Sequence, residues 1–276
     1  MTSGKLVIVA TPIGNLGDIT LRGLDALRNA DIIAAEDTRR TIKLLNHYEI
    51  TNKLLSFYQY SAKARYEEIL AILRDGKTVA LVSDAGTPVI SDPGYELVAL
   101  CLREGIAVES LPGPCAAVTA VTLSGEDCEH FMFWGFLNAK SAVRKKELAQ
   151  ILDTGIPCVV YESPNRIKKM LEDLCAIGGG KTVLCICREL TKRYEETLRM
   201  TAERALEFFA KKEAVKGEFA IVLFPSHEEK ETTDEEIKEV LEACLDKGMT
   251  KKDAAVYAKD TLGVSKNRAY QLLLKL

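Results

Sequence analysis

The sequence predicts an α/β protein made of two α/β domains, followed by a small helical region that resembles a helix-turn-helix. Apolar runs of strand composition alternate with amphipathic helical stretches through residues 5–224, as in largely parallel α/β architectures. The 276 residues are enough for roughly two domains, each with its own core. After residue 232 only helical patterns follow.

In the first half, four apolar runs predict strands, at residues 5–10, 31–36, 77–83 and 106–111. Helical patterns predict a helix from Thr20 and helices over residues 41–48, 61–74 and 95–105. Gly105 stands where a glycine commonly ends a helix. The segment LPGPCAAV (111–118) holds two prolines and a glycine, which cannot continue a strand. The predicted domain boundary is therefore here, between residues 1–112 and 113–225.

The second half repeats the alternation of strands and helices. Predicted strands lie at residues 130–137, 157–163, 181–190 and 217–224. A basic helix is expected over residues 141–152, and another is expected to begin with Ser163 as N-cap and Pro164 at its first position. A third helix is expected to open at Thr201.

Residues 225–232, PSHEEKET, have the composition of a linker to a helical tail over residues 233–276. Thr233 and Glu236 form a capping-box pattern, a second helix is expected from Thr250, and Ser265 is placed to cap a third. The last two helices resemble a helix-turn-helix. One interpretation is an appendage that packs on the body or on a partner subunit. The basic residues Lys266 and Arg268 favour contact with RNA.

Composition excludes several classes of protein. No apolar run approaches the roughly 20 residues of a membrane span, and the N-terminus lacks a secretory pattern, so we expect a cytoplasmic protein. The net charge of −3 argues against a uniformly basic surface, although residues 247–276 carry seven Lys/Arg against two acids. The eight cysteines include no CxxC pair, which favours buried thiols and no metal site.

Two glycine- and proline-rich loops follow predicted strands. The first, ATPIGNLGDIT (10–20), matches no common nucleotide-binding fingerprint, and many tight turns resemble it. The second, SDAGTPVISDPG (83–94), is longer than a turn between a strand and a helix needs to be. Its polar residues favour a ligand site at the carboxyl edge of the sheet, with Asp92 to Gly94 opening the next helix. The alternative is an elaborate helix cap.

Seven motifs in order resemble the ribosomal RNA small-subunit methyltransferase I family, a bacterial branch of the tetrapyrrole methylases. They are TPIGNLGDIT (11–20), AAEDTRRT (34–41), SDAGTPVISDPG (83–94), LPGPCA (111–116), FWGFL (133–137), YESPNRI (161–167) and GEFAIVL (217–223). The resemblance implies an enzyme that uses S-adenosylmethionine to methylate a cytidine ribose 2′-hydroxyl in the decoding region of 16S ribosomal RNA. It also implies a 30S substrate and a homodimer with a cofactor cleft between its two α/β domains.

The resemblance also assigns cofactor-binding positions. Those in the first domain and at the boundary are Pro12, Gly14, Asp84, Ala85, Gly86, Thr87, Ile90, Cys115 and Ala116. Those in the second domain are Glu162, Gly217 and Ala220. Cys115 departs from the Thr or Ser common in tetrapyrrole enzymes, so a hydroxyl contact is lost there.

A ribose hydroxyl is a poor nucleophile, so a base or a cation is expected beside it. The segment EDTRR (36–40) predicts that Glu36 or Asp37 positions or deprotonates the hydroxyl, with Arg39 and Arg40 on nearby phosphates. The alternative is a solvated helix start whose acids complement the helix dipole. Glu189, beside Arg188 and Lys192, is the second choice, and an ordinary ion-pair cluster is its alternative.

Cations in the second half are candidates for gripping RNA, which is commonly held by such groups with nearby aromatic rings. They are Lys140, Arg144, Lys145, Lys146 and Arg166. For any one of them the alternative is a solvated helix face. Two other functions also stay open: a precorrin-like small-molecule methylase of the same fold, and a non-enzymatic nucleic-acid-binding regulator built around the helical tail.

Overall fold

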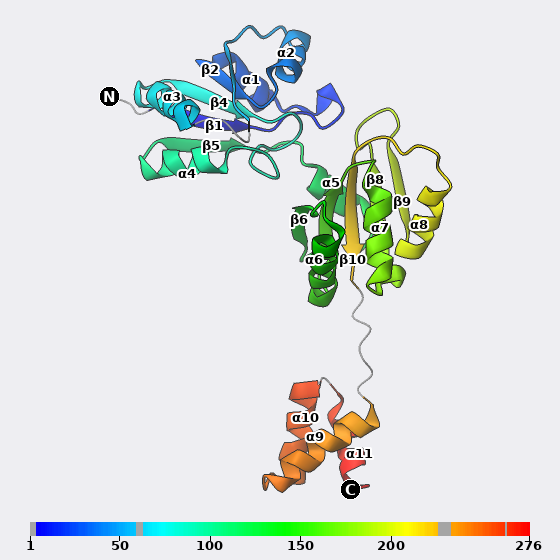
Figure 1. The fold of residues 1–276 in the computed structure, drawn as a ribbon. Helices are drawn as coiled ribbons and strands as arrows, with labels where there is room; N and C mark the ends of the chain where they lie inside the picture. Colours follow the sequence, from blue (N-terminus) through cyan, green and yellow to red (C-terminus); the bar gives the residue numbers. More distant parts are fainter. Residues whose placement is uncertain (1–3, 59–62, 226–232, 263) are drawn as a thin grey trace. The chain divides into compact units, whose positions relative to one another are not determined.

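The computed structural model describes residues 4–58, 63–225, 233–262 and 264–276. The chain forms two compact units, Met1–Pro225 and Ser226–Leu276. The first unit contains two five-stranded sheets with helices on their faces (Figure 1). The predicted α/β class is confirmed. The division of the first unit at residue 112 stays a proposal, because both sheets belong to one compact unit.

The first sheet has all neighbouring strands parallel. Its order is β3 (Leu54–Ser56), β2 (Ile32–Ala35), β4 (Thr78–Val82), β1 (Lys5–Val9) and β5 (Ala107–Leu111). Because side chains alternate along a strand, Val7 and Val9 face one layer of helices and Leu6 faces the other. The first layer is α1 (Leu21–Asn29) and α2 (Thr38–His47), and the second is α3 (Lys63–Arg74) and α4 (Tyr95–Arg103).

The parallel arrangement matters for function because it brings the carboxyl ends of all five strands to one edge. The loops after β1, β2, β4 and β5 therefore meet there. The loop after β1 contains a short helix, η1 (Leu16–Asp18). The short strand β3 is absent from the sequence predictions, because three half-buried residues are too few to show a period.

The second sheet is mostly antiparallel, so the expectation of a largely parallel architecture is wrong for this half. Its order is β6 (Met132–Phe136), β7 (Cys158–Glu162), β10 (Phe219–Phe224), β8 (Val183–Arg188) and β9 (Glu196–Thr201). Only the β6–β7 pair is parallel. In this sheet sequence reasoning missed β9, because its residues are half-buried or exposed and it lacks an apolar run.

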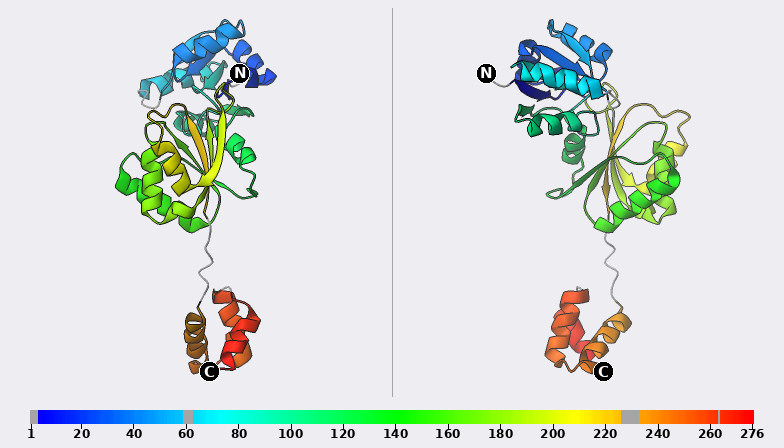
Figure 2. Two further views of the ribbon diagram at one scale, coloured as in Figure 1. Left: turned by 90° about the vertical axis from the view of Figure 1, so that its right-hand side faces the viewer. Right: turned by 60° about the vertical axis from the view of Figure 1, so that its left-hand side comes forward.

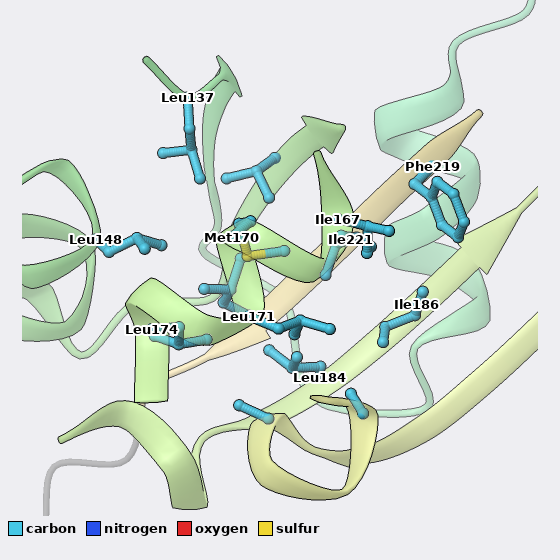
Figure 3. Packing of buried hydrophobic residues seen from close by; sticks show 14 of the residues in the cluster. Leu137, Leu148, Ile167, Met170, Leu171, Leu174, Leu184, Ile186, Phe219 and Ile221 are labelled. Atoms are coloured by element: carbon cyan, nitrogen blue, oxygen red, sulfur yellow. The ribbon is translucent and has the colours of Figure 1, made fainter. Parts of the chain in front are cut away.

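Helices cover both faces of the second sheet. α5 (Ala116–Leu123) packs on one face, against Val159 and Val222. The other face carries the larger core, built from α6 (Ser141–Thr154), α7 (Ile167–Ala176) and α8 (Ala202–Ala210). Figure 3 shows how leucines from α6 and α7 meet strand residues such as Ile186 and Ile221 in this core. A short helix, η2 (Gly179–Lys181), follows α7.

Helix α7 begins later than predicted. Its N-cap is Arg166, whereas Ser163 was expected to cap it. The backbone N–H groups of Arg166 and Ile167 both donate to the carbonyl of Ser163, at 3.1 Å each, so residues 164–166 form a turn before the helix. This turn keeps Ser163 and Pro164 at the end of β7 rather than inside a helix.

The second unit consists, in its described residues, of α9 (Asp234–Asp246), α10 (Lys251–Leu262) and α11 (Lys266–Leu273). The capping box of Thr233 and Glu236 is confirmed, and Ser265 caps α11 as predicted. The three helices pack on a core of their own, side by side in both views of Figure 2. The predicted linker from 226 and the turn at Gly263 lie outside the described residues. Among those described, no helix is long and apolar enough to cross a membrane.

Because each unit has its own core, we expect a chain ending at Pro225 to fold without the tail. Its melting temperature should lie within about 5 °C of the full-length value for the main transition, since no part of the first unit's core is removed. Thermal unfolding followed by circular dichroism would measure this. A truncated protein that unfolds without a cooperative transition would contradict it.

Candidate active site

Three loops are tied together at the carboxyl edge of the first sheet. Thr11 and Gly86 exchange two backbone hydrogen bonds, of 2.9 and 3.0 Å, which join the loop after β1 to the loop after β4. The hydroxyl of Thr87 donates to the carbonyl of Pro114 at 3.0 Å and joins the loop after β5. The glycine- and proline-rich segments therefore form one structure.

These loops and one end of the second sheet enclose a cavity of about 490 Å³, a size typical of small-molecule sites. Twelve residues predicted to carry function line it: Glu36, Arg40, Asp84, Ala85, Gly86, Thr87, Ile90, Cys115, Ala116, Glu162, Glu189 and Ala220. The lining also includes Phe136 and Tyr161, which the sequence suggested as aromatic rings near RNA, Lys192 beside Glu189, and Glu218 and Phe219 between Gly217 and Ala220. The lining residues for which the sequence suggested no binding or catalytic role are Ile13, Ser91, Asp92, Ser163, Pro164 and Leu190. Pro12, Gly14, Asp37 and Gly217 do not line it.

Gly14 approaches protein rather than the cavity. A Cβ placed there would lie 2.4 Å from Cγ of Lys192 and 2.7 Å from the carbonyl oxygen of Leu190. The loop after β1 therefore packs directly on the segment between β8 and β9. The glycine that was expected to border a cofactor instead lets the two halves of the unit pack closely.

The carboxylate of Glu189 is held by two hydrogen-bond donors from its own half of the unit. Its carboxylate accepts from the backbone N–H of Glu218 at 3.0 Å and from Lys192 Nζ at 2.8 Å. Burial acts to raise the pKa of Glu189, but these bonds outweigh it and the pKa is lowered. A Cβ on Gly217 would lie 2.5 Å from the side chain of Glu189, so this glycine also makes room for protein. Glu189 is thus a poor candidate for a base.

Asp37 is likewise committed to local structure. It is the N-cap of α2, and its carboxylate binds the backbone and the guanidinium of Arg39. The hydrogen bond from the Arg39 side chain is the main reason why the pKa of Asp37 is lowered to about 2. A carboxyl group with such a low pKa holds a proton weakly, so Asp37 is also a poor proton acceptor. Arg39, which was predicted to contact an RNA phosphate, forms an ion pair with Asp37.

Glu36 differs from Asp37 and Glu189, because burial raises its pKa and it lines the cavity. The N–H of Asp84 donates to Glu36 Oε2 at 3.3 Å. Asp84 in turn accepts from the N–H of Asp37 and pairs with Arg40, whose Nε lies 3.3 Å from Asp84 Oδ2. The chain of contacts fixes Glu36 and Asp84 on one wall of the cavity.

Asp92 is the principal residue that sequence reasoning missed. It was expected to open the helix after the loop, but α4 begins after Gly94 and Asp92 lines the cavity. Burial, and then the negative charge of Glu36, raise the pKa of Asp92 to about 7. Its place inside the SDAGTPVISDPG motif was the available signal. Sequence alone does not distinguish a helix cap from a side chain that faces a cavity.

The ionisation of Asp92 makes stability depend on pH. An unfolded chain ionises this carboxyl near pH 4, whereas the folded protein holds its pKa at about 7. Folding therefore favours the protonated form, and this stabilisation is lost as pH rises through about 7. We expect the free energy of unfolding of Asp92→Asn, relative to wild type, to increase by on the order of 2 kcal/mol between about pH 4 and pH 7. Above about pH 7 the difference should stay constant. Urea midpoints across this range measure it, and a difference that does not vary with pH would contradict it.

Glu162 has an unpaired buried oxygen. Its side chain is fully buried, and Oε1 accepts from the N–H of Ser163 at 2.8 Å and lies 3.1 Å from Nε of Arg166. Oε2 has no hydrogen-bond partner. Burial raises the pKa of this carboxyl. An unpaired buried oxygen on a residue that lines a cavity is suited to a ligand that donates a hydrogen bond.

The predicted RNA-binding cations divide into buried and exposed groups. Arg144 is 3% exposed, and its guanidinium is used by Asp173 at 2.6 Å and by the carbonyls of Asn138 and Ala139. The expectation that Arg144 contacts RNA is therefore wrong, because α6 turns this side chain into the core. Arg166 is engaged by Glu162 and the carbonyl of Leu137.

Other predicted cations remain accessible. Lys140 and Lys146 are exposed, and Lys145 lies 3.6 Å from Asp173 with its side chain 40% exposed. In the second unit Lys266 is exposed, whereas Arg268 pairs with Asp234 at 2.8 Å. In the described residues, no group of three or more His, Cys, Asp or Glu side chains is arranged to hold a metal ion.

Comparisons with known proteins place this site in a family. The model of the family described as Tetrapyrrole (Corrin/Porphyrin) Methylases matches residues 5–206. Ribosomal RNA small subunit methyltransferase I of Halalkalibacterium halodurans is 43% identical over 98% of this chain and 94% of its own length. The protein of the same name from Thermotoga maritima is 49% identical over 80% of this chain and 98% of its own length. That relative is therefore shorter by about the length of the second unit.

Solved structures share the fold at low sequence identity. Diphthine synthase superposes with a TM-score of 0.63 at 13% identity, covering 80% of this chain and 90% of its own. Uroporphyrin-III C-methyl transferase from Thermus thermophilus, complexed with S-adenyl homocysteine, gives a TM-score of 0.57 at 17% identity over 79% of this chain and 97% of its own. The fold, the cavity at the carboxyl edge and the near-full-length relatives agree: the chain belongs to the tetrapyrrole methylase family, in its ribosomal RNA small subunit methyltransferase I branch.

Proposed function

We propose that this methyltransferase transfers the methyl group of S-adenosylmethionine to the ribose 2′-hydroxyl of a cytidine in 16S ribosomal RNA, in the decoding region of the small subunit. The observation that carries the proposal is the carboxylate-lined cavity formed by the family motifs. Its support is the near-full-length similarity to proteins named for small-subunit ribosomal RNA.

The cavity residues suit a cationic nucleoside such as S-adenosylmethionine. Six carboxylates line it: Glu36, Asp84, Asp92, Glu162, Glu189 and Glu218. The two cations in the lining are already paired, Arg40 with Asp84 and Lys192 with Glu189 and Glu218. Negative side chains complement a sulfonium and an ammonium group. The unpaired Oε2 of Glu162 is suited to accept from an amine or a hydroxyl. When bound, the cofactor supplies an electrophilic methyl group.

Asp84, Ala85, Gly86, Thr87 and Ile90 would hold the cofactor on the side of the first sheet. Cys115, Ala116, Glu162 and Ala220 would hold it on the other side. Pro12, Gly14 and Gly217 would support these segments from outside the cavity, through the packing of the two halves. The Thermus methyltransferase of the same fold, whose structure holds S-adenyl homocysteine, supports this class of ligand.

The chain's own contribution to the reaction is positioning and proton acceptance. Methyl transfer to oxygen is an in-line displacement, so the enzyme must align the hydroxyl with the methyl group. Glu36 would accept the proton of the 2′-hydroxyl, because it is the predicted base that lines the cavity with a raised pKa. Asp84 would keep Glu36 in place through its backbone N–H.

Exposed cations would hold the RNA backbone. In the first unit these are Lys140, Lys145 and Lys146, with Arg40 in the lining of the cavity, and Lys266 belongs to the second unit. Salt should weaken such contacts. The protein would act in the cytoplasm as a homodimer, which the resemblance to the family supports.

The test is methylation of 30S particles and naked RNA, both prepared from a strain that lacks this activity, with labelled S-adenosylmethionine. Labelled RNA with a mark on a cytidine ribose is the expected result. Cofactor binding without transfer to RNA would indicate a small-molecule methylase. A protein that does not bind the cofactor would be a nucleic-acid-binding regulator instead.

A further inference from the structure

Strand β6 carries an irregularity that changes which way its aromatic side chains face. Along the β6–β7 pair, Phe133 is opposite Val159, but Gly135 is opposite Val160 and Phe136 opposite Tyr161. One extra residue, Trp134, is thus inserted between them as a β-bulge, and Gly135 adopts a φ of +78°. In a regular strand, residues three apart face opposite sides.

Because of the bulge, Phe133 and Phe136 face the same side of the sheet. Both rings contact Tyr161 edge-on, with centroids 5.1 and 5.6 Å away. Trp134 packs instead in the core on the opposite face. The phenolic oxygen of Tyr161 accepts the N–H of Ala117 at 3.0 Å, which fixes the ring that both phenylalanines contact.

Of the two phenylalanines, Phe136 both lines the cavity and is exposed to solvent. It lines the cavity with Tyr161, yet it is 55% exposed. Phe133 is 36% exposed and does not line the cavity. Packing in the core does not explain why a large apolar ring beside the cavity is more than half exposed to solvent. Exposed apolar side chains of this kind commonly mark binding surfaces.

The bulge also holds this ring next to the loop that carries the carboxylates. A Cβ on Gly135 would lie 2.8 Å from Oγ of Ser91, so the loop after β4 packs directly on the bulge. Ser91, Asp92 and Phe136 all line the same cavity. The ring of Phe136 and the carboxylates of the first half of the unit therefore line one cavity.

We infer that Phe136, re-aimed by the bulge in β6 and supported by Tyr161, is the surface on which the base of the methylated nucleotide stacks. The inference rests on the proposed function and adds a binding residue to it. A base stacked on a planar ring is held in a fixed plane, which orients its ribose towards the carboxylate wall. Exposed Lys140, four residues further along, is placed for an adjacent phosphate.

The test compares Phe136→Ala, Phe136→Leu and Phe136→Trp in the full-length protein with 30S particles as substrate. Loss of one stacking contact should lower kcat/KM for RNA roughly 10- to 100-fold in the Ala and Leu variants. The Trp variant should stay within about threefold of wild type, because it keeps a planar face. The dissociation constant for S-adenosylmethionine should change by less than about twofold in all three variants, since the ring is assigned to the RNA.

Phe133→Ala is the matched control, because it removes the same kind of ring and the same contact with Tyr161 from outside the cavity. Its kcat/KM should stay within about threefold of wild type. Equal losses at Phe133 and Phe136 would overturn the inference in favour of packing. Weaker S-adenosylmethionine binding in Phe136→Ala would overturn it in favour of the cofactor's adenine. Loss of the dimer in light scattering would overturn it in favour of a subunit interface.

Failure of the proposed function gives a different result. Wild-type protein that transfers no methyl group to 30S particles or naked RNA overturns the function, and the inference with it. Wild-type transfer with a fully active Phe136→Leu variant overturns only the inference.

Discussion

Glu36→Gln should lower kcat for RNA methylation by about 10²- to 10⁴-fold, the usual contribution of a positioned general base. Glutamine keeps the acceptor for the N–H of Asp84, which donates to Glu36 at 3.3 Å, but it cannot take a proton. Cofactor affinity should fall far less than kcat, because other carboxylates still line the cavity. Single-turnover rates with 30S particles, together with equilibrium binding of S-adenosylmethionine, measure the two effects separately.

Asp37→Asn is the control for Glu36→Gln. It lies one residue away, is outside the cavity lining, and keeps a side chain that caps α2. Its kcat should stay within about threefold of wild type. Full activity of Glu36→Gln would show that the proton goes elsewhere, and Asp92 would then be the next carboxylate to replace.

Arg144→Met should lower the free energy of unfolding by about 3–5 kcal/mol, because it removes the buried cation of Asp173 and leaves that carboxylate only the partly exposed Lys145, 3.6 Å away. Asp173 is 7% exposed and accepts from Arg144 Nε at 2.8 Å and from Ser141 at 2.7 Å. Burial acts to raise the pKa of Asp173, but these bonds outweigh it and the pKa is lowered. Urea unfolding monitored by circular dichroism measures the loss.

Two further variants separate a structural role for Arg144 from RNA binding. Combining Arg144→Met with Asp173→Asn removes both charges and should recover more than half of the lost stability, because no unpaired charge remains. Lys146→Ala, at an exposed position on the same helix, should change stability by less than about 0.5 kcal/mol. Unchanged stability in Arg144→Met, with weaker RNA binding, would restore the assignment that the structure contradicts.

The cavity at the edge of the first sheet could be predicted in outline because its loops follow parallel strands. Once the apolar runs are read as strands of one sheet, the segments after them must meet at its carboxyl edge. The loop that holds Asp84 to Thr87 was placed at this edge for this reason, whereas the cofactor positions in it and at Ala116 were assigned from the family resemblance. These residues and Glu36 all line the cavity. Asp92 was missed, because its position before a helix has an equally good local explanation.

The direction of the strands in the second sheet could not be predicted in this way. An apolar run has the same period whether its neighbour is parallel or antiparallel, and β9 has no such run. The glycines were also ambiguous. A missing side chain permits close approach, but at Gly14 and Gly217 the approaching group is protein.

By itself, the sequence determined the α/β class, the family, the loops that form the site and the caps of the tail helices. These follow from local patterns: periodicity, turn residues and motifs in order. Only the tertiary structure decided which residues of the same type are buried in the core and which face the solvent or the cavity. Arg144 and Lys146 look alike in the sequence, but only Arg144 meets a buried carboxylate. Phe133 and Phe136 share a face only because of a bulge. Whether a side chain is buried, and which face it lies on, depends on residues far away in the sequence. Local sequence patterns do not contain this information.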